Sequence, residues 1–193
     1  MHFNLVRFRA VIAAGALAVA AWLLTPSILR ADTHSSLSAP KLENAVTTEL
    51  QDLRSLMGKL NSDAGELEAF RHSPRLQWRT HADQLNQIRD HVNALGEQVS
   101  RLQKMKYASA EWQQRAIDLI VPVAVQVADR TQSAIHHLKE NRGYLWAPDY
   151  VDHLQAISAL SDKLYGTIDD CLEIAAAQQK IEQLDRRLAE RIS

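Results

Sequence analysis

Histidine is the residue type of this chain with the most capacity for chemistry, because neutral imidazole is a common ligand of Zn, Cu and Ni. Six histidines lie in stretches that we expect to be helical, and five of them gather near one end of the expected fold, which we call the histidine end. The sequence predicts a site for Zn, Cu or Ni there, with His81, His137, His153 and His72 as candidate ligands. His81 is the first candidate, since its place in the apolar repeat points it inward.

The same histidines have a purely structural interpretation. His136 and His137 are adjacent, so on a helix they point about 100° apart and cannot both face a core. In this interpretation His72 and His153 lie on solvated faces, and a partly buried His81 is satisfied by a hydrogen bond. Both interpretations place His81 inside the fold, and they differ in whether a metal is bound.

Other catalytic and cofactor sites need patterns that this chain lacks. The single cysteine, Cys171, rules out an intramolecular disulfide, CxxC metal motifs and covalent haem attachment, and its core position predicts an inert, buried thiol. Ferritin-like di-iron sites need Glu-x-x-His on two helices, and no such pair occurs, since Glu68 and His72 are four residues apart and this spacing is not repeated. No glycine-rich turn presents a nucleophilic serine. We therefore expect no enzyme.

A non-covalent haem would need two axial ligands at one level of the fold. Met57 and His153 differ by about 15 Å along the helices when both are counted from the histidine end, so they cannot share one haem. His81 and His153 lie at compatible levels, and they remain the alternative pair of haem ligands.

Apolar residues repeat in alternating steps of four and three along three long stretches, which is typical of amphipathic helices that pack together. Ser73 followed by Pro74 predicts the start of the second helix, and Ser109 is the expected cap of the third. Pro148 opens the fourth helix. The expected core positions are Val46, Leu50, Leu53, Met57, Leu60, Ala64 and Leu67 in the first helix, Trp78, His81, Leu85, Ile88, Val92, Leu95, Val99 and Leu102 in the second, and Leu154, Ile157, Ser161, Leu164, Ile168, Cys171 and Ala175 in the fourth.

The first three expected helices have nearly equal lengths of about 32 residues, or roughly 48 Å, and the fourth is longer. Short connections make consecutive helices antiparallel. The predicted fold is therefore all-α, an antiparallel up-down-up-down four-helix bundle with an extended C-terminal helix, formed by residues 41–193. A stack of αα-hairpin repeats is the alternative, although the sequence has no internal repeat.

The most apolar part of the helical region is Ile117–Ala128, where nine of the twelve residues are apolar. A helix this apolar should be buried on several sides. Pro122 within it removes a backbone N–H and should kink the helix. Counted along the bundle, Pro122 lies level with Gly166 and close to Gly96, so we expect an irregularity or a cavity where these small residues meet it.

The last twelve or so residues extend past the expected bundle. They keep a one-sided apolar stripe between charged residues, formed by Ile181, Leu184, Leu188 and Ile192. Two partners fit this stripe. One is the N-terminal linker of the same chain, and the other is a second copy in a coiled coil.

Residues 1–31 have the three parts of an export signal. Arg7 and Arg9 precede the apolar run Ala10–Leu24, and Ala31 is a small residue at the expected cleavage point. An uncleaved membrane anchor over residues 11–29 is the alternative. Residues 32–40 are polar and should form a linker. We therefore expect a periplasmic or extracellular protein, anchored in the inner membrane if the segment is retained.

Charge narrows the range of functions further. Removing residues 1–31 leaves 19 basic residues against 23 acidic ones, without the clustered positive charge that a nucleic-acid partner requires. We expect an exported, non-enzymatic helical-bundle protein of the cell envelope that binds a protein partner or associates with itself. A periplasmic metal-binding or metal-sensing protein that uses the histidine end is the alternative, and a sensory module with a ligand pocket between helices is a third interpretation.

Overall fold

The structure is a computed structural model that describes residues 39–70 and 77–192. This described part contains four long α-helices, one short 3-10 helix and no strand. The elements are α2 (Ala39–Phe70), α3 (Trp78–Met105), η1 (Lys106–Ala108), α4 (Glu111–Glu140) and α5 (Pro148–Ile192). The predicted all-α four-helix bundle is confirmed. The predictions for residues 1–31, for residues 32–38 and for His72 lie outside the described residues.

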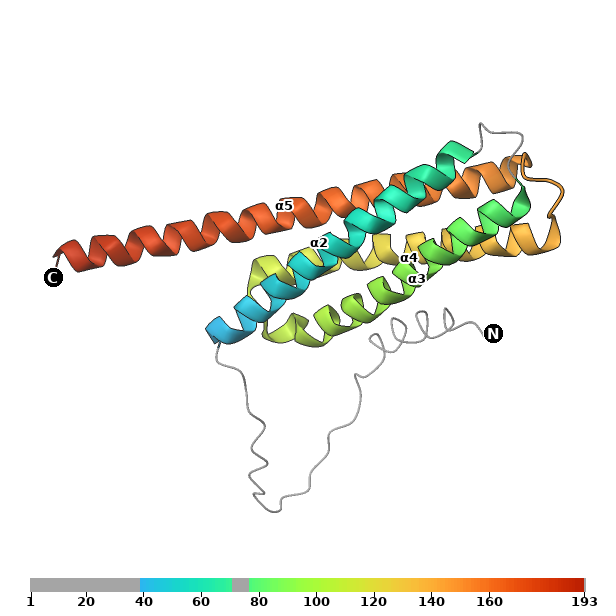
Figure 1. Cartoon of the computed structure of the whole chain (residues 1–193). Coiled ribbons are helices and arrows are strands. Elements are labelled where there is room, and N and C mark those ends of the chain that lie inside the picture. Colours follow the sequence, from blue (N-terminus) through green and yellow to red (C-terminus); the bar gives the residue numbers. More distant parts are fainter. Residues whose placement is uncertain (1–38, 71–76, 193) are drawn as a thin grey trace, which may run out of the picture.

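Each helix packs against two others, so the four helices form a closed ring around one core. α2 and α4 each pack along both α3 and α5, and they meet each other at one end, where Nε2 of Gln113 donates to the Glu43 carbonyl at 2.9 Å. Two ion pairs on the surface join neighbouring helices, since Arg101 of α3 lies 3.0 Å from Glu49 of α2 and Arg54 of α2 lies 2.6 Å from Asp169 of α5. Figure 1 shows that the chain direction reverses from each helix to the next.

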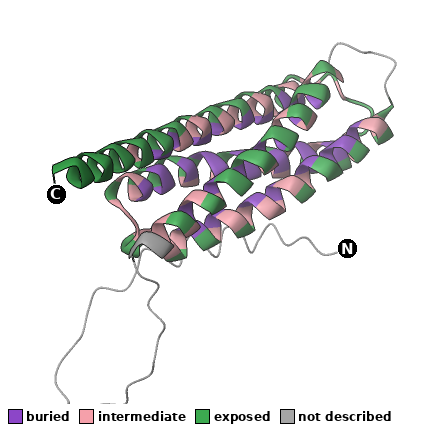
Figure 2. Ribbon diagram, turned by 60° about the vertical axis from the view of Figure 1, so that its left-hand side comes forward, coloured by how far each residue is buried: buried purple, intermediate pink, exposed green. Residues whose placement is uncertain are grey.

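The core is one continuous column of side chains from all four helices. Every position predicted to face inward in α2, α3 and α5 is buried, apart from the half-buried Trp78. Figure 2 shows the buried surface turned toward the centre of the bundle and the exposed surface turned outward. Each large apolar side chain gains roughly 1.5–3 kcal/mol from full burial, so this column is the main source of stability.

Two helix starts differ from the sequence predictions. α3 begins at Trp78 and not at Pro74, because Gln77 is still extended, with φ −78° and ψ 152°. The expected cap Ser73 and the expected first residue Pro74 lie outside the described residues. α2 begins at Ala39, inside the predicted linker. Proline is tolerated in the first turn of a helix, where its missing N–H would have no partner, so Pro40 does not delay the start.

The connection between α3 and α4 uses Ser109 differently from the prediction. Its Oγ donates to the Met105 carbonyl at 2.7 Å, so Ser109 closes the end of α3 and does not cap α4. The residue that precedes α4 is Ala110, whose backbone N–H donates to Oε1 of Gln113 at 3.2 Å. The N-terminus of α4 is thus satisfied from within the helix, by a glutamine three residues along.

Pro122 lies inside α4 without ending it. The helix is continuous from Glu111 to Glu140, and Pro122 is exposed on its outer face. Ile120 and Val123 face the core of the bundle. Because successive residues of a helix point about 100° apart, Pro122 then points away from the core. Gly166 is exposed as well, so the predicted meeting of Pro122 with small residues across the core is wrong.

The apolar stretch around Pro122 is also less enclosed than expected. Leu119 is 59% exposed, although Ile117, Ile120 and Val127 of the same stretch are buried. The stretch therefore presents one face to the core and leaves another in contact with water. The prediction that Ile117–Ala128 is buried on several sides is correct only for its inner half.

α5 is the longest helix and projects beyond the other three at its C-terminal end (Figure 1). Ala175 is its last buried residue, and no residue from Ala176 to Ile192 is buried. We call Ala176–Ile192 the overhang, which is about 25 Å long at 1.5 Å per residue. None of the helices in the described part of the chain combines the length and the apolar character needed to cross a membrane.

Replacing Pro122 with alanine should stabilise the protein. The new N–H can donate to the Asp118 carbonyl, which proline leaves without its helical partner, and the crowding by the proline ring disappears. We expect the free energy of unfolding to rise by about 1–3 kcal/mol in urea unfolding followed by circular dichroism. Gly166→Ala is the matched control, because an added side chain there meets nothing within 4 Å, and it should add about 1 kcal/mol. A loss of stability in Pro122→Ala alone would show that the bundle requires the backbone imposed by proline.

Candidate functional site

The histidine end is assembled around Tyr150, in the first turn of α5. The fully buried Tyr150 shares a hydrogen bond of 3.0 Å between its hydroxyl and Nδ1 of His81 in α3. The ring of His137 in α4 stacks on Tyr150, with centroids 5.2 Å apart and an interplanar angle of 23°. Phe70 at the end of α2 packs edge-on against His81 at 5.5 Å. One chain of ring contacts therefore joins all four helices.

The helical repeat explains why these rings meet. Tyr150 precedes Leu154 by four residues on the buried face of α5, and His81 precedes Leu85 by four on that of α3. Both residues thus extend their core repeat by one step toward the histidine end. The sequence analysis missed Tyr150 as the partner of His81, and the four-residue spacing of Tyr150 from Leu154 was the signal that could have found it.

Burial keeps the His81 imidazole neutral. The residue is 2% exposed, and desolvation lowers its pKa below the usual value of 6.5. Burial also raises the pKa of the Tyr150 hydroxyl, so that group keeps its proton. Two neutral groups can share a hydrogen bond in the core without the penalty of burying a charge. The pair holds α3 against α5 at the histidine end.

His153 lies one turn further along α5 and faces α4. Desolvation lowers the pKa of His153, electrostatic interactions with Arg130 and His137 act in the same direction, and Asp149 and Asp152 oppose them. Nδ1 of His153 and Nε2 of His137 are both buried, and neither has a hydrogen-bond partner among the described residues. These two imidazole nitrogens belong to neighbouring helices, α5 and α4.

The structure brings the four predicted metal ligands together only in part. His81 and His137 both contact Tyr150, and His153 is electrostatically coupled to His137. His72 lies outside the described residues. Within the described ranges, no three or more histidine, cysteine, aspartate or glutamate side chains form a group that could hold a metal ion. The site made of His81, His137, His153 and His72 therefore stays a prediction.

The other chemically capable groups have structural explanations. His136 is exposed while its neighbour His137 is half-buried, as the adjacency of the two residues requires. Nε2 of His91 lies 3.1 Å from Oδ2 of Asp63 and links α3 to α2 in the middle of the bundle. Cys171 is buried as predicted, and burial raises the pKa of its thiol, which keeps it protonated and unreactive.

The outer surface of the histidine end carries aromatic and cationic side chains. Tyr144 and Trp146, in the connection between α4 and α5, are 61% and 72% exposed, with ring centroids 5.6 Å apart. The guanidinium groups of Arg142 and Arg79 lie 4.5 Å and 5.3 Å from the ring centroid of Trp78. Trp, Tyr and Arg are the side chains that most often dominate protein–protein contacts, so this surface is suited to binding protein.

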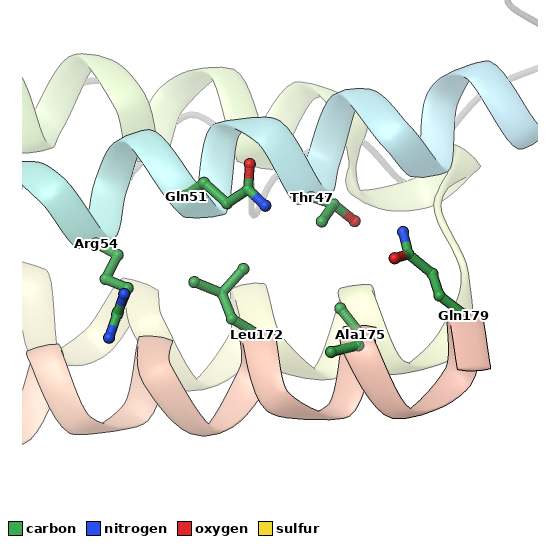
Figure 3. A pocket seen from close by; sticks show the side chains of 7 residues that line it. Thr47, Gln51, Arg54, Leu172, Ala175 and Gln179 are labelled. Atoms are coloured by element: carbon green, nitrogen blue, oxygen red, sulfur yellow. The ribbon is translucent and has the colours of Figure 1, made fainter. Parts of the chain in front are cut away.

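A groove of about 280 Å³ lies between α2 and α5, where the overhang begins (Figure 3). Figure 3 shows Leu172 and Gln179 reaching from α5 toward α2. Arg54 closes one end of the groove through its ion pair with Asp169. A second groove, of about 460 Å³, lies at the start of α4 and reaches Gln178 of α5. The two grooves flank the point where α5 leaves the bundle. The first groove is lined by Thr47, Gln51, Arg54, Leu172, Ala175, Ala176 and Gln179.

The protein should lose stability as the pH falls below about 6.5. The pKa values of His81 and His153 are lower in the folded chain than in the unfolded chain. As the pH falls, these two imidazoles are therefore protonated in the unfolded chain before they are protonated in the folded chain. The stability present above pH 6.5 is then lost as the pH falls toward the folded pKa values. Urea unfolding at about pH 7.5 and about pH 5.5 measures this loss. His81→Gln should reduce it, because glutamine keeps a hydrogen-bonding partner for Tyr150 and does not titrate.

His136→Gln is the control for this pH dependence, since His136 is exposed and outside the ring cluster. It should leave the difference in unfolding free energy between the two pH values unchanged. An equal pH dependence in the unaltered chain, His81→Gln and His136→Gln would exclude His81 as its source.

Comparisons with known proteins add no family to these observations. A scan of protein-family models, a search of curated proteins and a search of solved structures each gave no match to the chain. The function is therefore inferred from the residues of the chain and from their geometry.

Proposed function

We propose that the chain is an exported, non-enzymatic helical-bundle protein of the cell envelope that binds a protein partner through the overhang of α5. The observation that carries this proposal is the distribution of exposed apolar residues. Among the described residues, nine large hydrophobic side chains are at least 47% exposed, and five of these lie near the end of α5. The five are Ile174, Ile181, Leu184, Leu188 and Ile192.

An apolar stripe in water is unfavourable for a protein that acts alone. Each large apolar side chain gains up to roughly 1.5–3 kcal/mol when it moves from water into a packed interface. Monomeric proteins seldom leave apolar residues gathered in this way, so such stripes mark interaction surfaces. Because the overhang continues a helix that is anchored in the bundle, its stripe is already held in the shape that a partner would bind.

Export is supported by the N-terminal segment. Arg7 and Arg9 followed by the apolar run Ala10–Leu24 are typical of a signal that directs the chain out of the cytoplasm. Whether this segment is removed or kept as an anchor over residues 11–29, the bundle then lies on the outer side of the inner membrane. The non-enzymatic part of the proposal is supported by the histidine end, where His81 and Tyr150 bind each other inside the core.

Ending the chain after Gln178 should release the protein from its assembly. In fractionated cells, we expect the full chain in the envelope fraction with a native mass above the 21.7 kDa of one copy. The shortened chain should occur in the same fraction at the monomer mass. Both should unfold at nearly the same urea concentration, because the overhang contains no buried residue.

Leu119→Glu is the matched control for the removal of the overhang. Leu119 is an exposed apolar residue of α4 and lies outside the overhang, so its replacement should leave the assembly intact. Equal native masses for the full chain and the chain ending at Gln178 would reject the overhang as the binding surface.

A second candidate function is metal binding or sensing at the histidine end. The observation that favours it is the pair of buried nitrogens, Nε2 of His137 and Nδ1 of His153, without hydrogen-bond partners among the described residues. Zn, Cu and Ni all accept imidazole nitrogens from neighbouring helices. The predicted set of ligands adds His81 and His72.

Metal binding can be decided with protein purified without a histidine tag. If this candidate function is right, the protein should retain or take up Zn, Cu or Ni, and the fluorescence of the nearby Trp78 and Trp146 should change on titration. The double variant His137→Gln, His153→Gln should lose this response, whereas His136→Gln should keep it. Protein that holds no metal and gives no fluorescence change with any of the three ions rejects this function.

A further inference from the structure

We propose that the partner of the overhang is a second copy of this chain, and that the two α5 helices pair in parallel over residues 174–192. This inference rests on the proposed function, because it names the occupant of the surface that the function uses. Three features carry it: the rotational position of the apolar stripe on the helix, its heptad pattern and the charges beside it.

The core-facing side of α5 becomes polar where the bundle ends. The buried repeat of the helix runs in steps of three and four to Cys171 and Ala175. The next positions on the same face are Gln178, Glu182 and Asp185, none of which is buried. The overhang therefore does not continue the core of its own bundle.

The apolar residues of the overhang lie on a different face. Ile181, Leu184 and Leu188 each occur one residue before a position of the core repeat, which turns them by about 100° around the helix. They are 58%, 47% and 54% exposed. α5 therefore has a second apolar face, which lies beyond the last core residue, Ala175. Such a second face is the pattern expected of a second interface.

The linker of the same chain does not supply enough apolar surface to cover this face. Residues 32–38, DTHSSLS, contain a single large apolar residue, Leu37. One leucine cannot cover three or four large side chains spread over several helical turns. A second α5 helix, in contrast, offers a matching stripe of equal length.

The stripe fits the heptad pattern of a two-stranded coiled coil. Its a and d residues point to the partner helix, and within parallel coiled coils Ile at a with Leu at d favours two strands over three or four. Ile181 and Leu184 follow this rule at the centre of the stripe. Arg191, at the last d position, has a stem long enough to bring its charge to water. The a positions are Ile174, Ile181 and Leu188, and the d positions are Ala177, Leu184 and Arg191.

The charges beside the stripe distinguish the two directions of pairing. In a parallel pair, each g residue faces the following e residue of the other helix, so Lys180 of each copy faces Asp185 of the other. In the antiparallel arrangement that layers Ile181 on Leu184, Lys180 of each copy lies beside Arg187 of the other. Parallel pairing therefore gives two attractive pairs, whereas this antiparallel pairing gives two repulsive ones.

The bundle makes such a short interface feasible. α5 is one continuous helix from Pro148 to Ile192, so the overhang extends a helix that the bundle has already formed. The unfavourable nucleation that makes short isolated helices unstable is thus absent. Because the pairing surface covers only about three heptads, we expect dissociation in about the micromolar range.

Exchanging the flanking charges tests the pairing in the full chain, studied by sedimentation in a mild detergent. The unaltered chain should show a monomer–dimer equilibrium. Lys180→Glu should weaken dimerisation on the order of ten-fold, because it sets like charges opposite each other twice, and Asp185→Lys should do the same. The double variant Lys180→Glu, Asp185→Lys should return to within about two-fold of the unaltered chain. Lys163→Glu, an exposed change on α5 within the bundle, is the control and should have no effect.

Disulfide formation tests the parallel direction independently. In a parallel coiled coil the two d residues of one layer lie opposite each other, so Leu184→Cys should give a dimer that is sensitive to reduction. Arg186→Cys places the thiol on the outer side of the same turn and should give none. The native Cys171 is buried and 5% exposed, so it does not interfere.

The results separate this inference from the proposed function. If removal of the residues after Gln178 abolishes the assembly but the charge exchanges and Leu184→Cys do not behave as stated, parallel self-pairing is rejected. The overhang then binds another protein or residues 1–31, and the proposed function stands. If the full chain is a monomer both in sedimentation and in the envelope fraction, both proposals are rejected.

Discussion

The burial of one apolar repeat on each helix is the constraint on which the rest of this structure depends. The repeat sets the rotation of every helix about its axis. Two ion pairs, Arg54 with Asp169 and Arg101 with Glu49, lie at the edges of the helix faces that the repeat brings together. At one end, the repeat carries polar rings into the core, where they must satisfy one another. At the other end α5 extends beyond the other three helices, and its inward face becomes polar after Ala175. Both unusual regions of the molecule are therefore places where a regular core ends.

The sequence predicts the parts of the fold in which apolar and polar residues alternate clearly. The inward positions of α2, α3 and α5 follow from steps of three and four, and Pro148 marks the first residue of α5. The side of α4 on which Pro122 lies could not be predicted from such a pattern. Apolar residues surround it in Ile117–Ala128, so the pattern carries no rotational information, and the direction of Pro122 is set by how α4 packs on α3 and α5. The start of α2 was also missed, because a proline in the first turn of a helix is compatible with a helix that begins one residue earlier.

The candidate site was predictable in position but not in detail. The inward direction of His81 and the exposure of His136 follow from helical geometry. The partner of His81 is separated from it by 69 residues along the chain, so the hydrogen bond to Tyr150 depends on how α3 and α5 align. A histidine on an inward face can be a metal ligand or part of a hydrogen-bonded core, and the choice depends on which groups the other helices bring to it.

The uninterrupted course of α5 has a mechanical consequence. Tyr150 and the end of the overhang belong to one rod of 45 residues, and they lie about 60 Å apart along it. α5 packs against α2 and α4 from Tyr150 to Ala175, so the bundle holds this part of the rod and only the overhang projects as a free arm. A change of about 5° in the direction in which α5 leaves the bundle would carry Ile192 through about 2 Å, because the overhang is about 25 Å long. The packing of α5 along its two neighbours therefore sets the direction in which the overhang points.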